Sequence, residues 1–285
     1  MKELIRFKKQ REIGEIITDT FKFIRLEYKP LFKALIKNVA LSFIFLLIAV
    51  GYYTSIATDF SLFAADVFRS GDVIIAVLFL LVTLMLYYGF LYGTVLNYIK
   101  SYIKNQGEVD QDEISECVRS NLGRLLGLGV VSAIMVFFGL VCCIIPGIYF
   151  MVPLTVVFPL MVFKRVGITD SISESFILIK GEWWMTFITI IILGLIVYLI
   201  QMVFQIPVLI YTIMKGLASS DEISNGDFTS MFDWVYVTLN VISSAVSYIL
   251  YTVSAITSAF IYFNLNESKN QTGTFEKIDS IGDSN

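Results

Sequence analysis

The chain alternates between long apolar runs and short charged segments. Five runs contain no Asp, Glu, Lys or Arg, namely residues 38–58, 73–99, 125–163, 183–214 and 234–266. A helix needs roughly 20 mostly apolar residues to cross a hydrocarbon core about 30 Å thick. Every run except 125–163 fits a single crossing. The pattern therefore predicts an all-α fold, a polytopic transmembrane helix bundle.

The run 125–163 is too long for one crossing, since as a single helix it would extend about 58 Å at about 1.5 Å per residue. Pro146-Gly147 lies at its middle, where proline removes a backbone donor and glycine permits a turn, so we expect a helical hairpin. Pro153 and Pro159 predict a kink in the second arm, and whether 148–164 fully spans the bilayer stays open. The six predicted spans are about 34–57, 73–99, 123–145, 148–164, 183–213 and 234–264.

Lysine and arginine are segregated among the connecting segments. All of them except Arg69 and Lys215 lie in residues 1–37, 100–124 and 164–180 or in the C-terminal tail. Cytoplasmic loops carry an excess of these residues, so the pattern predicts six crossings with both termini in the cytoplasm. Five crossings would place these segments on opposite sides of the membrane. Residues 266–285 are polar and are expected to form a disordered cytoplasmic tail.

An internal repeat is predicted from apolar residues at helical spacing, with charged residues between them. At an offset of 155 the stripe before the first span recurs before the fifth, and at 101 a weaker match precedes the third. The alternative is that any membrane protein has interfacial helices before its spans. The stripes are Ile13, Ile17, Phe21, Ile24 and Tyr28; then Ile168, Ile172, Phe176, Ile179 and Trp183; then Ile114, Val118, Leu122 and Leu125.

Each repeat unit would be a cytoplasmic amphipathic helix followed by a transmembrane hairpin, with boundaries near 11–100, 108–164 and 166–265. Such helices lie at the headgroup boundary, where amphipathic aromatic rings are favoured. The residues expected at this depth are Phe21, Tyr28, Phe176, Trp183 and Trp184.

The five runs contain no Asp, Glu, Lys, Arg or His, but polar and small residues recur in some of them. In the last span a polar stripe predicts either close helix packing with interhelical hydrogen bonds or the wall of a polar cavity. Gln201 and Gln205 add a polar face to the fifth span, and Gly89 and Gly93 have a spacing that lets helices approach closely. The stripe consists of Asn240, Ser244, Ser247, Tyr251, Ser254 and Ser258.

The residues for common catalytic chemistry are missing. The chain has no histidine, the usual general base and zinc ligand, and no glycine-rich phosphate loop. Cys117, Cys142 and Cys143 form no disulfide framework. We therefore predict a protein that is not an enzyme, without catalytic residues, cofactor, metal or nucleic-acid partner.

A sequence motif supports this architecture. The motif consists of Ile145-Pro146-Gly147-Ile148-Tyr149, then Pro153 and Pro159, then Ser171 to Lys180, and then Gly181-Glu182-Trp183-Trp184. Over about residues 120–200 the chain resembles the membrane domain of some bacterial glycerophosphodiester phosphodiesterases and related stand-alone six-pass proteins. The resemblance implies a helical bundle in the bacterial cytoplasmic (inner) membrane. It carries no active-site residue, because catalysis in those enzymes belongs to a separate soluble barrel.

Two functional hypotheses follow. The first is a membrane protein that organises membrane lipids or protein partners, with a membrane protein or a second copy of the chain as the protein partner. The second is a transporter or pore for a small neutral or lipidic substrate, based on the polar stripe and on Gln201 and Gln205.

Overall fold

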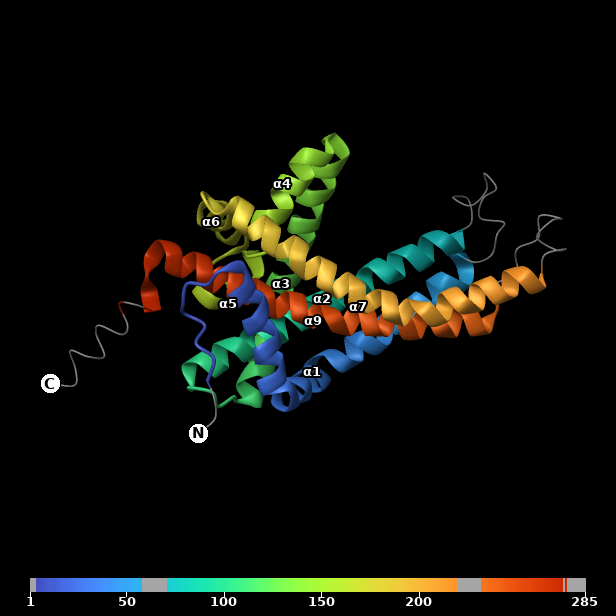
Figure 1. Cartoon of the computed structure of the whole chain (residues 1–285), viewed down its shortest axis with the longest axis horizontal. Coiled ribbons are helices and arrows are strands. Elements are labelled where there is room, and N and C mark those ends of the chain that lie inside the picture. The colour runs from blue at the N-terminus through green and yellow to red at the C-terminus, as the bar shows by residue number, and fades with distance from the viewer. Residues whose placement is uncertain (1–3, 58–70, 220–231, 274, 276–285) are drawn as a thin grey trace. The chain divides into compact units, whose positions relative to one another are not determined.

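The structure is a computed structural model that describes residues 4–57, 71–219, 232–273 and 275. Those residues are mostly helical and contain no strand (Figure 1). The helices are α1 (Ile13–Ala57), α2 (Gly71–Lys104), α3 (Gln111–Cys142), α4 (Ile144–Leu154), α5 (Val157–Lys164), α6 (Ile168–Ile179), α7 (Trp183–Ala218) and α9 (Trp234–Asn270).

Six helical segments are long and apolar enough to cross a membrane, with α4 and α5 counted together as one. Large apolar side chains on these helices are exposed, including Leu41, Phe137 and Val203. A water-soluble protein rarely exposes contiguous apolar surface of this kind, whereas acyl chains cover it in a bilayer. The prediction of an all-α bundle with six spans is confirmed, and the chain is a multi-pass membrane protein.

The helices form two compact units. Unit 1 comprises Met1–Val39, Gly89–Gly194 and Thr252–Asn285, and unit 2 comprises Ala40–Tyr88 and Leu195–Tyr251. Helices α3 to α6 belong wholly to unit 1, whereas α1, α2, α7 and α9 each run from one unit into the other. Both units are therefore built partly from the same long helices.

The first amphipathic stretch and the first span form one continuous helix, α1, although the sequence predicted a span beginning near residue 34. The matching stretch in α6 is separated from α7 by Lys180, Gly181 and Glu182. Gly181 has a φ of 90°, which glycine adopts readily. The residue 155 positions earlier is Leu26, whose side chain disfavours that conformation, so α1 continues where α6 ends.

The offset of 155 recurs in the structure, because α1 begins at Ile13 and α6 begins at Ile168. Buried positions also correspond along the two helices. The buried face is not the predicted apolar stripe, whose members on α1 are half-buried or exposed. Thr20 and Glu27 lie on the buried face of α1 instead. The corresponding buried pairs are Ile16 and Ser171, Thr20 and Ser175, and Phe23 and Leu178.

The predicted hairpin of α3 and α4 is present, but its turn lies earlier than expected. The break is at Cys143, whose backbone is extended at φ −172° and ψ 143°, rather than at Pro146-Gly147. Pro146 instead lies in the first turn of α4, where a missing N–H costs nothing. Gly147 allows the two arms to touch, because a Cβ there would lie 2.8 Å from the backbone nitrogen of Leu140.

The second arm of this hairpin is interrupted at Thr155 and Val156, between α4 and α5. This agrees with the kink predicted from Pro153 and Pro159. Pro153 lies near the end of α4, and Pro159 lies in the first turn of α5. The arm is therefore two short helices in succession.

Helix α9 continues to Asn270, beyond the start of the tail predicted at residue 266. Glu267 is buried, and its carboxylate accepts hydrogen bonds from the Gly273 N–H at 2.8 and 3.0 Å and from the Thr272 hydroxyl. These bonds hold the residues after the helix, although their composition is polar. Residues 276–285 of the predicted tail lie outside the described residues.

Unit 2 is held by aromatic contacts between α2 and the first half of α9. The Tyr87 hydroxyl donates a hydrogen bond of 2.7 Å to the Tyr248 carbonyl. Tyr87 also packs against Phe43 of α1 at 5.8 Å between ring centroids, and Tyr88 packs edge-on against Tyr251 at 5.3 Å. Buried tyrosines usually need a partner for the hydroxyl, and Tyr87 has one.

Asp233 connects the C-terminal part of α7 to the start of α9. We expect Asp233→Ala to lower the free energy of unfolding by about 1–2 kcal/mol. Its carboxylate caps α9 by accepting from Val235 N–H at 3.1 Å and Tyr236 N–H at 3.2 Å. It also pairs with Lys215 Nζ at 2.8 Å and accepts from the Tyr211 hydroxyl at 2.6 Å. Denaturant unfolding in detergent would measure the loss.

The pH dependence supplies the control for this prediction. The Lys215 ammonium and the Tyr211 hydroxyl lower the pKa of Asp233 to about 2. A lowered pKa means that the contribution is complete above the ordinary value of 3.8 and is lost as pH falls towards 2. The difference between wild type and Asp233→Ala should therefore shrink over that window. A difference that stays constant to pH 2 would contradict this role.

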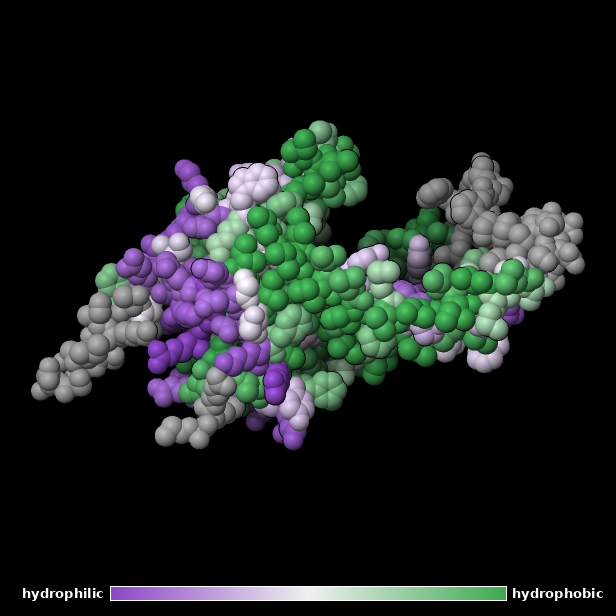
Figure 2. Space-filling model, in the orientation of Figure 1, coloured by the Kyte–Doolittle hydropathy of each residue, from purple (hydrophilic) through white to green (hydrophobic). Residues whose placement is uncertain are grey.

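Unit 1 has an aromatic core at the end that carries the N-terminal segment. Phe7 is 2% exposed and stacks on Phe260 of α9 at 4.6 Å between ring centroids. Phe23 of α1 and Tyr102 of α2 meet it edge-on. Figure 2 shows hydrophilic residues gathered around the N-terminal segment and the end of α9, whereas the surface of α4 is hydrophobic.

Candidate functional site

Helices α2 and α3 approach closely because α2 carries glycines where they meet. A Cβ on Gly89 would lie 2.7 Å from Leu126 Cδ2, and a Cβ on Gly93 would lie 2.9 Å from Leu125 Cδ1. A larger side chain at either position would require these leucine side chains to move. This close contact places Asn97 and Lys100 of α2 on the same cavity as residues of α3.

The cavity is a basic pocket in unit 1 with a volume of about 250 Å³. Its lining includes three cationic side chains, Lys100, Arg124 and Arg165, and no carboxylate. Two carboxamides, a thiol and an apolar wall complete it. The remaining lining residues are Asn97, Cys117, Asn121, Leu125, Met161 and Val162.

Lys100 connects α2 to the end of α5. It is half-buried, and its Nζ donates a hydrogen bond of 2.7 Å to the Val162 carbonyl in the last turn of α5. The last carbonyls of a helix carry partial negative charge, so this bond offsets a feature that would repel an anion. An ammonium has three donors, which leaves two for a ligand.

Arg165 adopts a backbone conformation that is unfavourable for arginine. It ends α5 with φ 58° and ψ 34°, the left-handed region where glycine or asparagine is usual. A residue with a Cβ pays about 1–2 kcal/mol there. Its side chain is exposed and lines the basic pocket. Strain at a position that lines a pocket is a feature of functional sites.

Arg124 completes the set of cations from α3. It is exposed, and no described carboxylate lies within ion-pair distance of Arg124 or Arg165. The carboxamides are oriented by their own helices, since Asn97 Nδ2 donates to the Gly93 carbonyl at 2.8 Å and Asn121 Nδ2 donates to the Cys117 carbonyl at 2.9 Å. The pocket therefore combines uncompensated positive charge with fixed polar groups.

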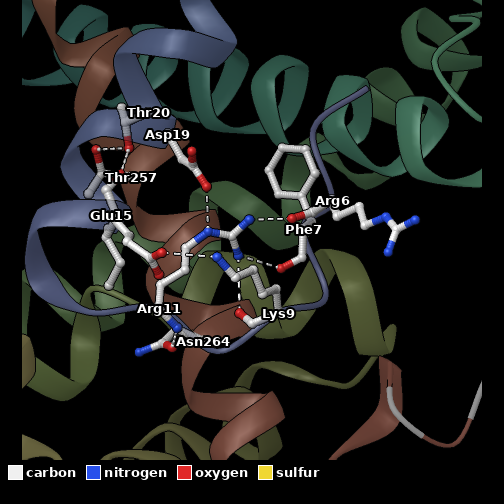
Figure 3. Close-up of polar contacts among 10 residues, drawn as sticks. Arg6, Phe7, Lys9, Arg11, Glu15, Asp19, Thr20, Thr257 and Asn264 are labelled. Carbon is white, nitrogen blue, oxygen red and sulfur yellow. Dashed lines mark hydrogen bonds and ion pairs between the residues drawn. The ribbon is translucent and has the colours of Figure 1, made fainter. Parts of the chain in front are cut away.

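Arg11 lies in a second polar cluster of unit 1, in which four of its five side-chain N–H donors have acceptors (Figure 3). It is 5% exposed, and its Nε pairs with Asp19 Oδ2 at 2.8 Å. Its other donors reach the carbonyls of Phe7 at 2.8 Å, of Lys9 at 3.1 Å and of Arg6. This cluster therefore engages the Arg11 guanidinium mainly with the chain itself.

The predicted polar stripe of the last span is divided between the units. Asn240, Ser244, Ser247 and Tyr251 lie in unit 2, and Ser254 and Ser258 lie in unit 1. Ser247 donates to the Ser243 carbonyl at 3.2 Å and Ser258 to the Ala255 carbonyl at 2.8 Å, so these hydroxyls bond to their own helix. Gln201 is half-buried and Gln205 is exposed on α7. A polar cavity along the stripe stays a prediction.

The aromatic residues predicted for interface depth fall into two groups. Trp183 stacks on Tyr149 at 6.0 Å and on Phe187 at 4.9 Å between ring centroids, and Phe176 meets Tyr149 at 6.5 Å. Tyr28 and Trp184 are 56% and 70% exposed, and Phe21 is half-buried. Exposed rings remain available to headgroups, and their depth in a membrane stays a prediction.

Sequence reasoning used Lys100, Arg124 and Arg165 only to orient the spans and did not bring them together. The charge pattern alone could not do so, because the three residues lie on different elements. The sequence did not reveal that α2 meets α3 at Gly93, and this contact brings the three cations to one cavity. Comparison with known proteins found no matching family model, no matching curated protein and no matching solved structure.

Proposed function

We propose that this multi-pass membrane protein is not an enzyme and binds the headgroup of an anionic membrane lipid in the basic pocket, at the cytoplasmic face. The observation that carries the proposal is the convergence of Lys100, Arg124 and Arg165 on one cavity without a lining carboxylate. Basic pockets between transmembrane helices on that side suit acidic lipid headgroups. Through such binding the protein would organise lipid around its helices.

The apolar wall of the pocket favours a lipid ligand. Leu125, Met161 and Val162 line the same cavity as the cations. A headgroup with its first acyl carbons presents both kinds of surface, whereas a small hydrated ion presents only charge. Arginine also suits this task, because its planar fork bonds two phosphate oxygens at once.

We expect Arg124→Gln with Arg165→Gln to reduce retention of anionic phospholipid about 30-fold, since two lost cations at about 1 kcal/mol each give about 2 kcal/mol. Native mass spectrometry of the full chain, purified in mild detergent and returned to defined lipid mixtures, would measure the retention.

The matched control is Arg25→Gln with Arg119→Gln. Both arginines are exposed and neither lines the pocket, so this variant changes the net charge equally and should retain lipid within about twofold of wild type. Equal losses in the two double variants would reduce the effect to general electrostatics and overturn the proposal.

Arg165→Gly separates binding from folding. Glycine suits the left-handed backbone at this position, so the variant should unfold at the same denaturant concentration as wild type or higher while retaining less anionic lipid. Unchanged lipid retention would show that the strained arginine has no part in binding.

A further inference from the structure

We infer that the basic pocket selects a terminal phosphate, that is a phosphomonoester, over the phosphodiester of ordinary phospholipids. This rests on the proposed function and concerns the chemical class of the headgroup.

The donors of the basic pocket exceed what a phosphodiester can use. Arg124 and Arg165 each carry five N–H donors, and Lys100 keeps two after its bond to the Val162 carbonyl. A phosphodiester carries one negative charge and two free oxygens. A phosphomonoester carries about −1.5 to −2 at pH 7 and three strong acceptor oxygens. Three cations without a lining carboxylate therefore match the monoester in charge and in acceptors.

The charged residues around the basic pocket do not neutralise its positive charge. Lys104 and Glu113 lie on the neighbouring turns of α2 and α3 and pair with each other at 2.8 Å, so they add little net charge. Lys164, beside Arg165, pairs with Glu174 of α6 at 2.6 Å. Among the described residues, no ion pair joins Lys100, Arg124 or Arg165 to a carboxylate, so the positive charge of the pocket is not neutralised from within the protein.

Cys117 offers a direct readout, because it lines the pocket and is half-buried. In a background with Cys142→Ser and Cys143→Ser, the rate of its alkylation by a neutral water-soluble maleimide reports occupancy. Full-length protein would be placed in phosphatidylcholine nanodiscs containing phosphatidate, or phosphatidylglycerol, or no anionic lipid. Native mass spectrometry of the same samples would count bound lipids independently of the thiol.

At pH 7.5 we expect phosphatidate to slow the alkylation at least tenfold and to be retained, and phosphatidylglycerol at equal mole fraction to slow it less than twofold. The preference should shrink towards pH 5, because the second pKa of a phosphomonoester is about 6 and the arginines stay charged. Arg124→Gln with Arg165→Gln should remove the protection, and Arg25→Gln with Arg119→Gln should keep it.

The outcomes separate the two claims. Equal protection and retention with phosphatidylglycerol would overturn the selectivity and leave anionic lipid binding intact. If neither phosphatidate nor phosphatidylglycerol protects Cys117 or is retained, both the selectivity and the binding of anionic lipid would be overturned. Protection by millimolar glycerol phosphate or inorganic phosphate in phosphatidylcholine nanodiscs, with none from phosphatidate, would keep the terminal phosphate as the recognised group and overturn the lipid as its source.

Discussion

Arg11→Ala is expected to lower the free energy of unfolding by about 3–5 kcal/mol. The reason is that Arg11 is the centre of the contacts that hold the segment before α1 to the rest of unit 1 (Figure 3). Its removal leaves Asp19 and the carbonyls of Arg6, Phe7 and Lys9 without their donor.

Further contacts of the same residue add to the loss. The Arg11 guanidinium lies 4.9 Å from the centroid of the Phe260 ring, so its removal also exposes the face of a buried aromatic. The Arg11 backbone N–H donates to Asn264 Oδ1 at 2.6 Å. This bond persists in the variant only if the segment stays docked. Urea unfolding in detergent, followed by tryptophan fluorescence, would measure the change.

Two variants make this prediction specific. Arg11→Lys keeps the charge but lacks the planar fork, so it should recover only part of the loss. Arg119→Ala removes an exposed arginine and should change stability by less than about 0.5 kcal/mol. If Arg11→Ala and Arg119→Ala unfold at the same urea concentration, the cluster of Figure 3 contributes little to stability.

Gly147→Val is expected to cost about 3 kcal/mol or to prevent the hairpin of α3 and α4 from closing. A Cβ on Gly147 would lie 2.5 Å from Leu140 Cδ2 and 2.8 Å from the Leu140 backbone nitrogen. A side chain could rotate away, but the backbone of α3 cannot, so the arms must separate. Thermal unfolding in detergent, with yield of folded protein, would measure the effect.

Gly194→Val is the matched control, because nothing lies within 4 Å of a Cβ at Gly194. The same substitution in an apolar helix should therefore cost less than about 1 kcal/mol. Comparable losses at Gly147 and Gly194 would mean that the close approach at Gly147 is not important for the fold.

The spans could be predicted because the bilayer imposes a length on each apolar run, and charges delimit every run. The turn at Cys143 could not, because Pro146 and Gly147 fit equally well into the first turn of a helix. The sequence also failed to find that Glu27 is buried. Glu27 accepts a hydrogen bond of 2.8 Å from the Tyr98 hydroxyl of α2, a partner 71 residues away. Periodicity along one helix cannot reveal a contact with another.

The basic pocket illustrates the same limit. Lysine and arginine positions predicted which segments share a side of the membrane, and this prediction already grouped Lys100, Arg124 and Arg165 in adjoining segments. It could not identify which of the many cations meet at one cavity. That depends on the contact of Gly93 with α3 and on the left-handed backbone at Arg165, and both are tertiary features.

The most direct test of the central claim is an electron cryomicroscopy structure of the full chain in nanodiscs that contain anionic phospholipid. The account predicts headgroup density in the basic pocket, with the phosphate within hydrogen-bond distance of Arg124 and Arg165 and acyl density passing Leu125. Arginine side chains turned to solvent around a water-filled pocket, with anionic lipid bound elsewhere on the protein, would contradict it.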